Sequence, residues 1–524
     1  MVKFLPVSKK ELKKIGWSKL DIIIITGDAY IDHPGFGAAI IGRFLESNGF
    51  KVGIISQPDW KSDQDFLELG KPELFFGITS GNMDSMVNHY TAQKRIRTND
   101  AYSPEGKPGL RPNRATIIYS QKIRSLFKNA PIIIGGIEAS LRRIPHYDFW
   151  SDKVRNSILF DSKADILVYG MAEKPILEIA QELQSGTQIN ELKNIKGTVV
   201  SSKKVTEKDH ILLPEFSKNF TKEDFYEMYQ TFYENYFKKV IYQKFSNRYL
   251  KHNLPSEPLS TAEIDNIYNL PYARLPHPIY KNKKITAFEQ IKNSITSHRG
   301  CFGGCYFCSL SIHQGRTIQS RSIGSIINNI KNISQKDYFK GTISDIGGPT
   351  ANMYGMFCKK NLEKSCSIDS CIYPEICTNL KFSHEKQKTL LKKCREIKSV
   401  KNLFITSGIR HDLALTDKEY IKEISENHTS GLLKLAPEHK SEKVLKYMNK
   451  PGFYKYEEFV KIFSEYSRKC GKKQFIVPYI IVGHPGSDLT DAIELALYLK
   501  KHNIKLKQIQ EFTPTPMTIS TMMY

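Results

Sequence analysis

Two stretches of the chain alternate short apolar segments with helical patterns, and this alternation limits the folds that the chain can adopt. In residues 20–185 the apolar segments are continuous and rich in isoleucine, as buried parallel strands are. The alternation predicts an open, doubly wound α/β sheet of the Rossmann type. We expect its strands at residues 21–26, 51–56, 74–78, 116–119, 131–135 and 166–169.

A different stretch separates this region from a second alternating one. Residues 196–290 are polar and rich in lysine and tyrosine, with a helical pattern over residues 221–249, and they predict a connector of mixed helical content. From residue 291 six strand–helix units follow, which predict a partial parallel (β/α)6 barrel. Their strands are expected at residues 292–296, 341–345, 402–407, 431–435, 474–481 and 506–512.

The sequence thus predicts three segments. They are an N-terminal Rossmann-like domain at residues 1–195, the connector at 196–290, and the barrel at 291–524 with a cysteine-rich insertion at 355–385. The chain stops at residue 524 without a polar tail, from which we expect the natural protein to continue.

Charge and hydropathy bear on three classes of protein: nucleic-acid-binding, secreted and membrane-spanning proteins. The chain has 77 Lys and Arg against 54 Asp and Glu, a net charge of +23. This excess is spread along the chain as lysine, which is typical of a solvated surface, whereas a clustered arginine patch would indicate nucleic acid. A nucleic-acid-binding protein is therefore an alternative without specific support. The N-terminus has no signal segment, and no apolar run approaches the roughly 18 residues of a membrane-spanning helix, so we expect a cytoplasmic protein.

Three cysteines lie in one short loop directly after the first predicted strand of the barrel. Cys301, Cys305 and Cys308 have the spacing C-x3-C-x2-C, and loops at this end of barrel strands form active sites. Three thiolates can ligate three irons of a [4Fe-4S] cubane and leave the fourth iron open. An open iron can chelate S-adenosylmethionine, whose reductive cleavage gives a 5′-deoxyadenosyl radical. Phe307, just before the last cysteine, is placed to shield the site or to stack on adenine.

A structural zinc ion is the alternative interpretation of this loop. His298 or His313 would then supply the fourth ligand of a Cys3His site. Zinc ligands usually come as two separated short pairs, so the spacing favours the cluster.

The cysteine spacing and the aromatic residue are similar to those of the radical SAM superfamily, and longer stretches resemble the YgiQ-type radical SAM proteins over nearly the whole chain. These stretches are residues 26–34, 81–88, 135–143, 146–152, 347–354 and 435–439. The resemblance implies an N-terminal α/β domain before a radical SAM barrel, a [4Fe-4S] cluster, S-adenosylmethionine, and an electron donor such as a flavodoxin or ferredoxin. It implies no particular substrate.

The resemblance also suggests roles within the barrel. Gly347 and Gly348 resemble a Gly-Gly-Glu element whose backbone contacts the methionine amino group, although Pro349 stands in place of the glutamate. Polar residues near the middle strands of the superfamily contact the cofactor, so we expect Arg410 to pair with a carboxylate as a fork. An exposed loop arginine is an equally good account of Arg410.

A second cysteine group follows in the predicted insertion. It consists of Cys358, Cys366, Cys371 and Cys377. The alternatives are an auxiliary iron–sulfur cluster, a zinc ion, or reduced thiols, because the gaps match no tight ligand template. An RNA-modifying methyltransferase or methylthiotransferase is a further alternative function that this group would suit.

The N-terminal domain resembles the cobalamin-binding folds that precede some radical SAM barrels. An axial histidine normally stands two positions after an aspartate, whereas His33 directly follows Asp32. This spacing argues against bound cobalamin and favours a resemblance in fold only.

Overall fold

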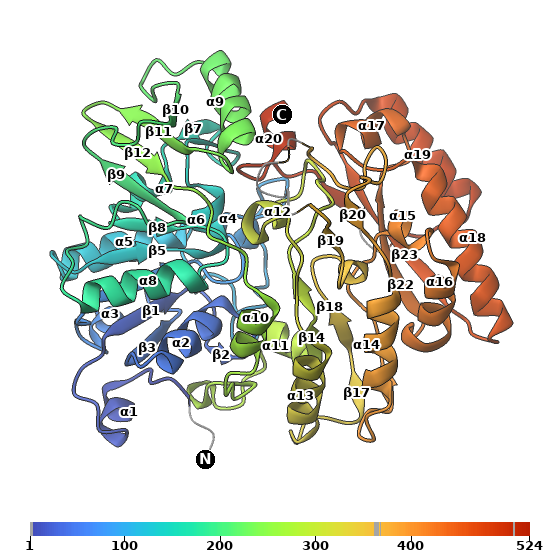
Figure 1. The fold of residues 1–524 in the computed structure, drawn as a ribbon, viewed down its shortest axis with the longest axis horizontal. Coiled ribbons are helices and arrows are strands. Elements are labelled where there is room, and N and C mark those ends of the chain that lie inside the picture. Colours follow the sequence, from blue (N-terminus) through green and yellow to red (C-terminus); the bar gives the residue numbers. More distant parts are fainter. Residues whose placement is uncertain (1–3, 361–365, 367, 507–508) are drawn as a thin grey trace. The chain divides into compact units, whose positions relative to one another are not determined.

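The computed structural model describes residues 4–360, 366, 368–506 and 509–524. The chain packs into two units, shown as ribbons in Figure 1. The first consists of Met1–Glu257 and Leu270–Lys292, and the second of Pro258–Asn269 and Asn293–Tyr524.

A nine-stranded sheet forms the centre of the first unit in the described residues. In spatial order its strands are β10 (His210–Leu213), β11 (Val240–Phe245), β12 (Arg248–His252), β9 (Thr198–Ser202), β8 (Ile166–Val168), β5 (Ile132–Ile134), β4 (Phe75–Thr79), β1 (Ile22–Thr26) and β3 (Val52–Ser56). The strands from β3 to β8 are parallel and have the chain order 2-1-3-4-5. This is a doubly wound order, which confirms the predicted Rossmann-like sheet.

Helices and two short antiparallel strand pairs complete the first unit. The helices are α1 (Lys9–Lys14), α2 (Gly37–Ser47), α3 (Gln64–Leu67), α4 (Ser85–His89), α5 (Ala115–Leu126), α6 (Gly136–Leu141), α7 (Ile158–Ser162), α8 (Glu173–Gln184), α9 (Lys222–Asn235) and α11 (Thr286–Ile291). Strand β2 (Ile31–Asp32) pairs with β13 (Leu275–Pro276), and β6 (His146–Asp148) with β7 (Lys153–Arg155).

The predicted strand at residues 116–119 is wrong, because this segment belongs to helix α5. The start of α5 is fixed by tertiary bonds: the Ala115 N–H donates to the Ser85 hydroxyl at 3.1 Å, and the Thr116 N–H donates to the Glu138 carboxylate at 3.0 Å. These partners lie far away in the sequence, and they override the strand preference of two adjacent isoleucines.

The segment that we expect as a connector contributes to the sheet. Strands β9 to β12 extend it beyond β8, with antiparallel pairing at β8–β9, β9–β12 and β11–β12. The expected helix over residues 221–249 is α9 only, and residues 240–245 form β11. The boundaries of the three predicted segments stay a prediction, while packing divides the chain into two units.

Parallel strands in chain order form the sheet of the second unit. They are β14 (Ser294–Thr296), β17 (Thr342–Ile343) with β18 (Asp345–Gly347), β21 (Asn402–Leu403), β22 (Leu432–Glu438), β23 (Phe475–Val482) and β24 (Ile509–Glu511). Pairing runs from β14 to β18, from β17 to β21, through a bridge of Ile409 with Leu435, and from β22 through β23 to β24. Six successive parallel positions confirm the partial (β/α)6 barrel.

Helices cover this sheet. They are α10 (Thr261–Tyr268), α12 (Leu310–Gln314), α13 (Ile323–Ser334), α14 (Glu385–Arg395), α15 (His411–Ala414), α16 (Lys418–Glu423), α17 (Glu442–Tyr447), α18 (Phe453–Lys469), α19 (Leu489–Lys501) and α20 (Ile519–Met523). Antiparallel hairpins join β15 (His298–Arg299) to β16 (Gln319–Ser320), and β19 (Phe357–Cys358) to β20 (Leu380–Lys381).

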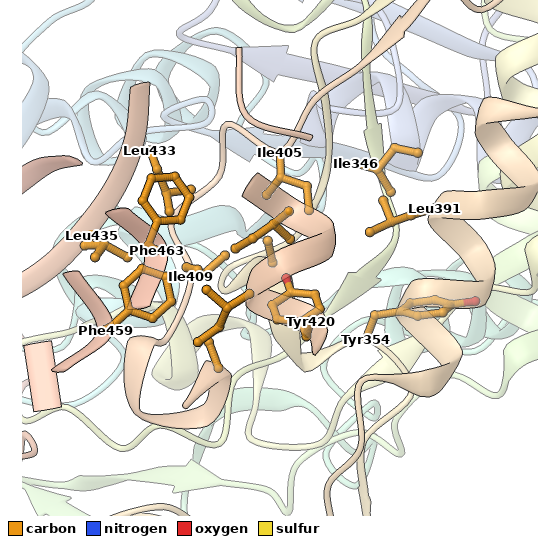
Figure 2. Packing of buried hydrophobic residues seen from close by; sticks show 14 of the residues in the cluster. Ile346, Tyr354, Leu391, Ile405, Ile409, Tyr420, Leu433, Leu435, Phe459 and Phe463 are labelled. Atoms are coloured by element: carbon orange, nitrogen blue, oxygen red, sulfur yellow. The ribbon is translucent and has the colours of Figure 1, made fainter. Parts of the chain in front are cut away.

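The main core of the second unit lies between strands and helices. Figure 2 shows Ile346 of β18 and Leu433 of β22 packed with Leu391 of α14 and Phe459 of α18. Each such side chain, buried completely, contributes about 1.5–3 kcal/mol. This core fixes the strand ends from which the candidate site is built. No helix in the described ranges combines the length and apolar character that crossing a bilayer requires.

Candidate active site

The loop of the first cysteine group follows β14 and β15 and is held by backbone bonds. The Cys301 N–H donates to the Gly315 carbonyl, and the Tyr306 N–H donates to the Met448 carbonyl, each at 3.1 Å. Gly304 has φ +64°, and a β carbon there would collide with the Asp369 carbonyl. The loop therefore needs glycine at this position in order to pack against a distant segment.

The three thiols of this loop share one half-buried site. Burial raises the pKa of Cys301, and the neighbouring Cys305 raises it further. Burial raises the pKa of Cys308 to about 12, with Cys305 and Cys301 as the next causes. A thiolate at one of these cysteines therefore disfavours deprotonation of the next. A bound metal cation would offset this repulsion, and metal ligands of this kind lose their protons when the metal binds.

The three thiols are not arranged as the ligands of a single ion. In the part of the chain that the structure describes, no three His, Cys, Asp or Glu side chains are grouped to hold a single ion. In a cubane each thiolate binds a different iron, so its ligands are spread over separate corners. The short loop, the mutual influence of its thiols and this spacing fit an iron–sulfur cluster.

Arg410 lies directly beside this group. Its Nη1 donates to the Cys305 sulfur at 3.3 Å, while Nε and Nη2 donate to the two carboxylate oxygens of Asp412 at 2.9 and 2.6 Å. Although burial disfavours both charges, Asp412 raises the pKa of Arg410, and Arg410 lowers that of Asp412. The guanidinium of Arg410 therefore forms a bidentate pair with Asp412 of the same chain, and its remaining N–H points at the Cys305 sulfur.

Gly347 and Gly348 end β18 in a crowded place. A β carbon at Gly347 would lie 2.8 Å from Asp345 Oδ2 and would collide with the Ser407 hydroxyl. At Gly348 it would lie 2.7 Å from the His298 ring. Packing alone thus requires both glycines, and their contact with the methionine amino group stays a prediction.

Phe307 is half-buried and reaches the loop after β23. Its ring lies 6.4 Å from that of His484, in a T-shaped arrangement. His484 is fixed by the Ser520 hydroxyl at 2.7 Å and lies 5.1 Å from the Phe512 ring. The structure therefore brings Phe307 together with the loop of residues 482–486.

His298, a candidate fourth ligand for zinc, is already engaged through both ring nitrogens. Nε2 donates to the Thr350 carbonyl at 3.1 Å, and Nδ1 lies 2.8 Å from the Ser297 hydroxyl. Burial lowers the pKa of His298 to about 4, so the ring is neutral at pH 7. A Cys3His zinc site that uses His298 would have to break these bonds.

Sequence reasoning gave no role to a buried charge pair on the same side of the barrel. Glu438 Oε1 lies 3.7 Å from Lys450 Nζ, and both side chains are at most 10 % exposed. Burial raises the pKa of Glu438, and Lys450 and Arg410 oppose that shift. Glu438 also adopts φ +71°, which is rare for glutamate and is the kind of backbone strain found at functional sites.

The histidine nearest to a cobalamin motif is not free. His33 Nδ1 accepts from the Gly35 N–H at 3.0 Å, and Nε2 lies 3.3 Å from Arg274 Nη1. Burial lowers the pKa of His33. These partners agree with the unfavourable sequence spacing, so His33 does not fit as an axial ligand of cobalamin.

Two family models match the chain, and a solved structure is similar to it in fold. The model described as Radical SAM superfamily matches residues 295–499, and the model described as Radical SAM N-terminal matches residues 4–294. The fold is similar to that of the radical S-adenosylmethionine methyltransferase TsrM from Kitasatospora setae, solved with cobalamin and a [4Fe-4S] cluster bound. That likeness has a TM-score of 0.54 at 12% identity and covers 96% of this chain and 77% of TsrM.

The fold, the cysteine loop and these models define a radical SAM enzyme, which uses a [4Fe-4S] cluster and S-adenosylmethionine. A UPF0313 protein from Methanocella arvoryzae is 49% identical over 524 residues, which cover 99% of this chain and 87% of the relative. The UPF0313 protein YgiQ from Escherichia coli is 44% identical over 583 residues, with coverage of 99% and 79%. The chain belongs to the UPF0313 family.

Proposed function

We propose that Cys301, Cys305 and Cys308 ligate three irons of the [4Fe-4S] cluster and that S-adenosylmethionine docks on the fourth. The observation that carries this assignment is the single loop at the end of β14 that holds all three thiols in one half-buried site, with Arg410 donating to the Cys305 sulfur. When bound and reduced, the cluster supplies the electron that cleaves the sulfonium of S-adenosylmethionine.

The residues around the loop prepare this step electrostatically. Arg410 places one positive charge against the negative cluster ligands, and Asp412 fixes the orientation of the guanidinium through a bidentate pair. A charge-assisted N–H···S bond stabilises a thiolate relative to a thiol. We therefore assign Arg410 to the cluster instead of to the carboxylate of S-adenosylmethionine.

Phe307, Gly347 and Gly348 are proposed to receive the cofactor. The Phe307 ring beside His484 forms an aromatic wall suited to adenine and excludes water from the cluster. The two glycines let the chain turn closely past Ser407 and His298 at the end of β18, and we propose that their backbone contacts the methionine amino group. We further propose a flavodoxin or ferredoxin as the electron donor and a cytoplasmic location, where thiols stay reduced.

The test is the formation of 5′-deoxyadenosine by the full chain under anaerobic conditions. With dithionite and S-adenosylmethionine, we expect the reconstituted protein to form the nucleoside and Cys305→Ala to fall to the background rate. Cys470→Ala is the matched control, because Cys470 lies after α18 and in neither cysteine group. Equal product from Cys305→Ala and the native chain would contradict the assignment.

A further inference from the structure

The second cysteine group is brought together by the fold, although its spacing matches no ligand template. The Cys371 and Cys377 side chains pack against the same small buried core. The Cys377 N–H donates to the Cys371 carbonyl at 2.9 Å, which closes the loop between them. The β19–β20 hairpin places Cys358 opposite Leu380, whose N–H donates to the Cys377 carbonyl at 2.9 Å.

This loop is anchored directly on the loop of the first cysteine group. The Cys371 N–H donates to the Phe302 carbonyl at 3.1 Å, and the Ser370 hydroxyl donates to the Gly303 carbonyl at 2.8 Å. The Tyr306 hydroxyl donates to Asp369 at 2.7 Å. Neighbouring backbone segments thus hold the two groups in place within the second unit.

A small apolar core underlies both groups. Its buried members are Phe302, Met353, Met356, Ile372, Leu380 and Leu413, and Cys301, Cys371 and Cys377 pack against it. Thiols of both groups therefore contact the same apolar core. The second group is packed against the barrel and faces a region of low dielectric constant on one side.

A buried arginine N–H that has no acceptor in the described part of the chain lies beside the second group. Arg316 Nη2 lies 3.9 Å from the Cys371 sulfur, and Arg316 Nε is buried without a hydrogen-bond partner among the described residues. A buried N–H without an acceptor is rare in folded proteins and calls for an explanation. Thiolate sulfur and inorganic sulfide are acceptors that would satisfy it.

We infer that Cys358, Cys366, Cys371 and Cys377 ligate a second iron–sulfur cluster. Ligands of one zinc ion lie about 2.3 Å from a common centre, and no described sulfurs converge in that way. A cubane does not require its ligands to meet at one centre, because each thiolate binds its own iron. Four protein thiolates leave no open corner, so this cluster differs from the first in not binding S-adenosylmethionine.

Iron and sulfide analysis of the anaerobically reconstituted full chain tests this inference. We expect about eight iron and eight sulfide per chain, four of each from every cubane. The triple variant Cys301→Ser/Cys305→Ser/Cys308→Ser should keep about half of the iron, with an electron paramagnetic resonance signal that S-adenosylmethionine leaves unchanged. The double variant Cys371→Ser/Cys377→Ser should also lose about half, and its remaining signal should respond to S-adenosylmethionine.

The outcomes separate this inference from the proposed function. Complete loss of iron in the triple variant, or one zinc per chain that only the double variant removes, would overturn the second cluster and leave the first intact. Cys470→Ser serves as the control, because it lies outside both groups. Circular dichroism shows whether the double variant folds. If it does not, the iron content of the triple variant alone still tests whether a second cluster is present.

Discussion

The strand ends of the two units are filled in different ways. In the first unit the chain places buried ion pairs of its own at the ends of the parallel strands, such as Asp28 with Arg111 at 2.8 Å, and Asp84 with Arg142. In the second unit the corresponding loop carries three thiols beside a single arginine fork. Ligands bind at this edge of parallel sheets in general. This difference agrees with the proposal that the cluster binds at this edge of the second unit.

The largest expected effect that tests this contrast is the loss of an ion pair in the first unit. Asp28→Ala leaves the buried Arg111 without its closest carboxylate and should lower the free energy of unfolding by about 3–5 kcal/mol. Lys122→Ala, which breaks an exposed pair with Asp63, should cost at most about 1 kcal/mol. Denaturant unfolding measures both values.

A double variant sharpens the same comparison. Burial raises the pKa of Asp28 to about 6 in spite of Arg111, so the attraction within the pair does not fully offset the desolvation of the carboxylate. Asp28→Leu/Arg111→Met should therefore be close to neutral in stability. If Asp28→Ala cost no more than Lys122→Ala, the ion pairs at this edge would not have the structural role described above.

A buried histidine of the second unit gives the next effect, through pH. The His384 ring stacks on Tyr420 at 4.1 Å, and burial lowers its pKa from 6.5 to about 4. The unfolded chain therefore binds the proton first, and stability should fall as pH drops from 6.5 to 4, by up to about 3 kcal/mol. In His384→Gln this pH-dependent loss should become smaller, as followed by denaturant unfolding at each pH. An unchanged pH profile would contradict the pKa shift.

The smallest expected effect concerns the arginine beside the first cysteine group. Arg410→Lys keeps a positive charge but loses the bidentate grip on Asp412 and the fixed direction toward Cys305. Cluster retention under a chelator and the rate of 5′-deoxyadenosine formation should each fall about 10–100-fold, as for other partners of metal ligands. Lys107→Arg on the exposed surface of the first unit is the control. Equal retention in both variants would show that the fork is only structural.

The sequence predicts the two sheets and the first cysteine group because these depend on local patterns. Apolar runs of four to six residues mark the strands, and the cysteine spacing is a loop property. The sequence does not predict features that depend on contacts between residues far apart in the chain. Helix α5 is fixed by Glu138, and the second cysteine group is held together by contacts with Phe302 and Gly303. No pattern near residues 115 or 371 contains that information.

The Arg410 fork is an instructive intermediate case. Its partner Asp412 is only two positions away, so the local sequence is enough to predict this pair. The local sequence does not predict that the third N–H of Arg410 points toward Cys305, which lies 105 positions earlier. The local pair with Asp412 and the remote contact with Cys305 together support the proposal that Arg410 serves the cysteine loop.

The most direct test of the central claim is Mössbauer spectroscopy of the Cys371→Ser/Cys377→Ser variant, reconstituted with isotopically enriched iron. With its four irons in one cluster, one iron carries no protein ligand. The account predicts that S-adenosylmethionine shifts about a quarter of the iron signal and leaves the rest unchanged. A spectrum unaffected by S-adenosylmethionine, or a variant that binds no iron, would contradict it.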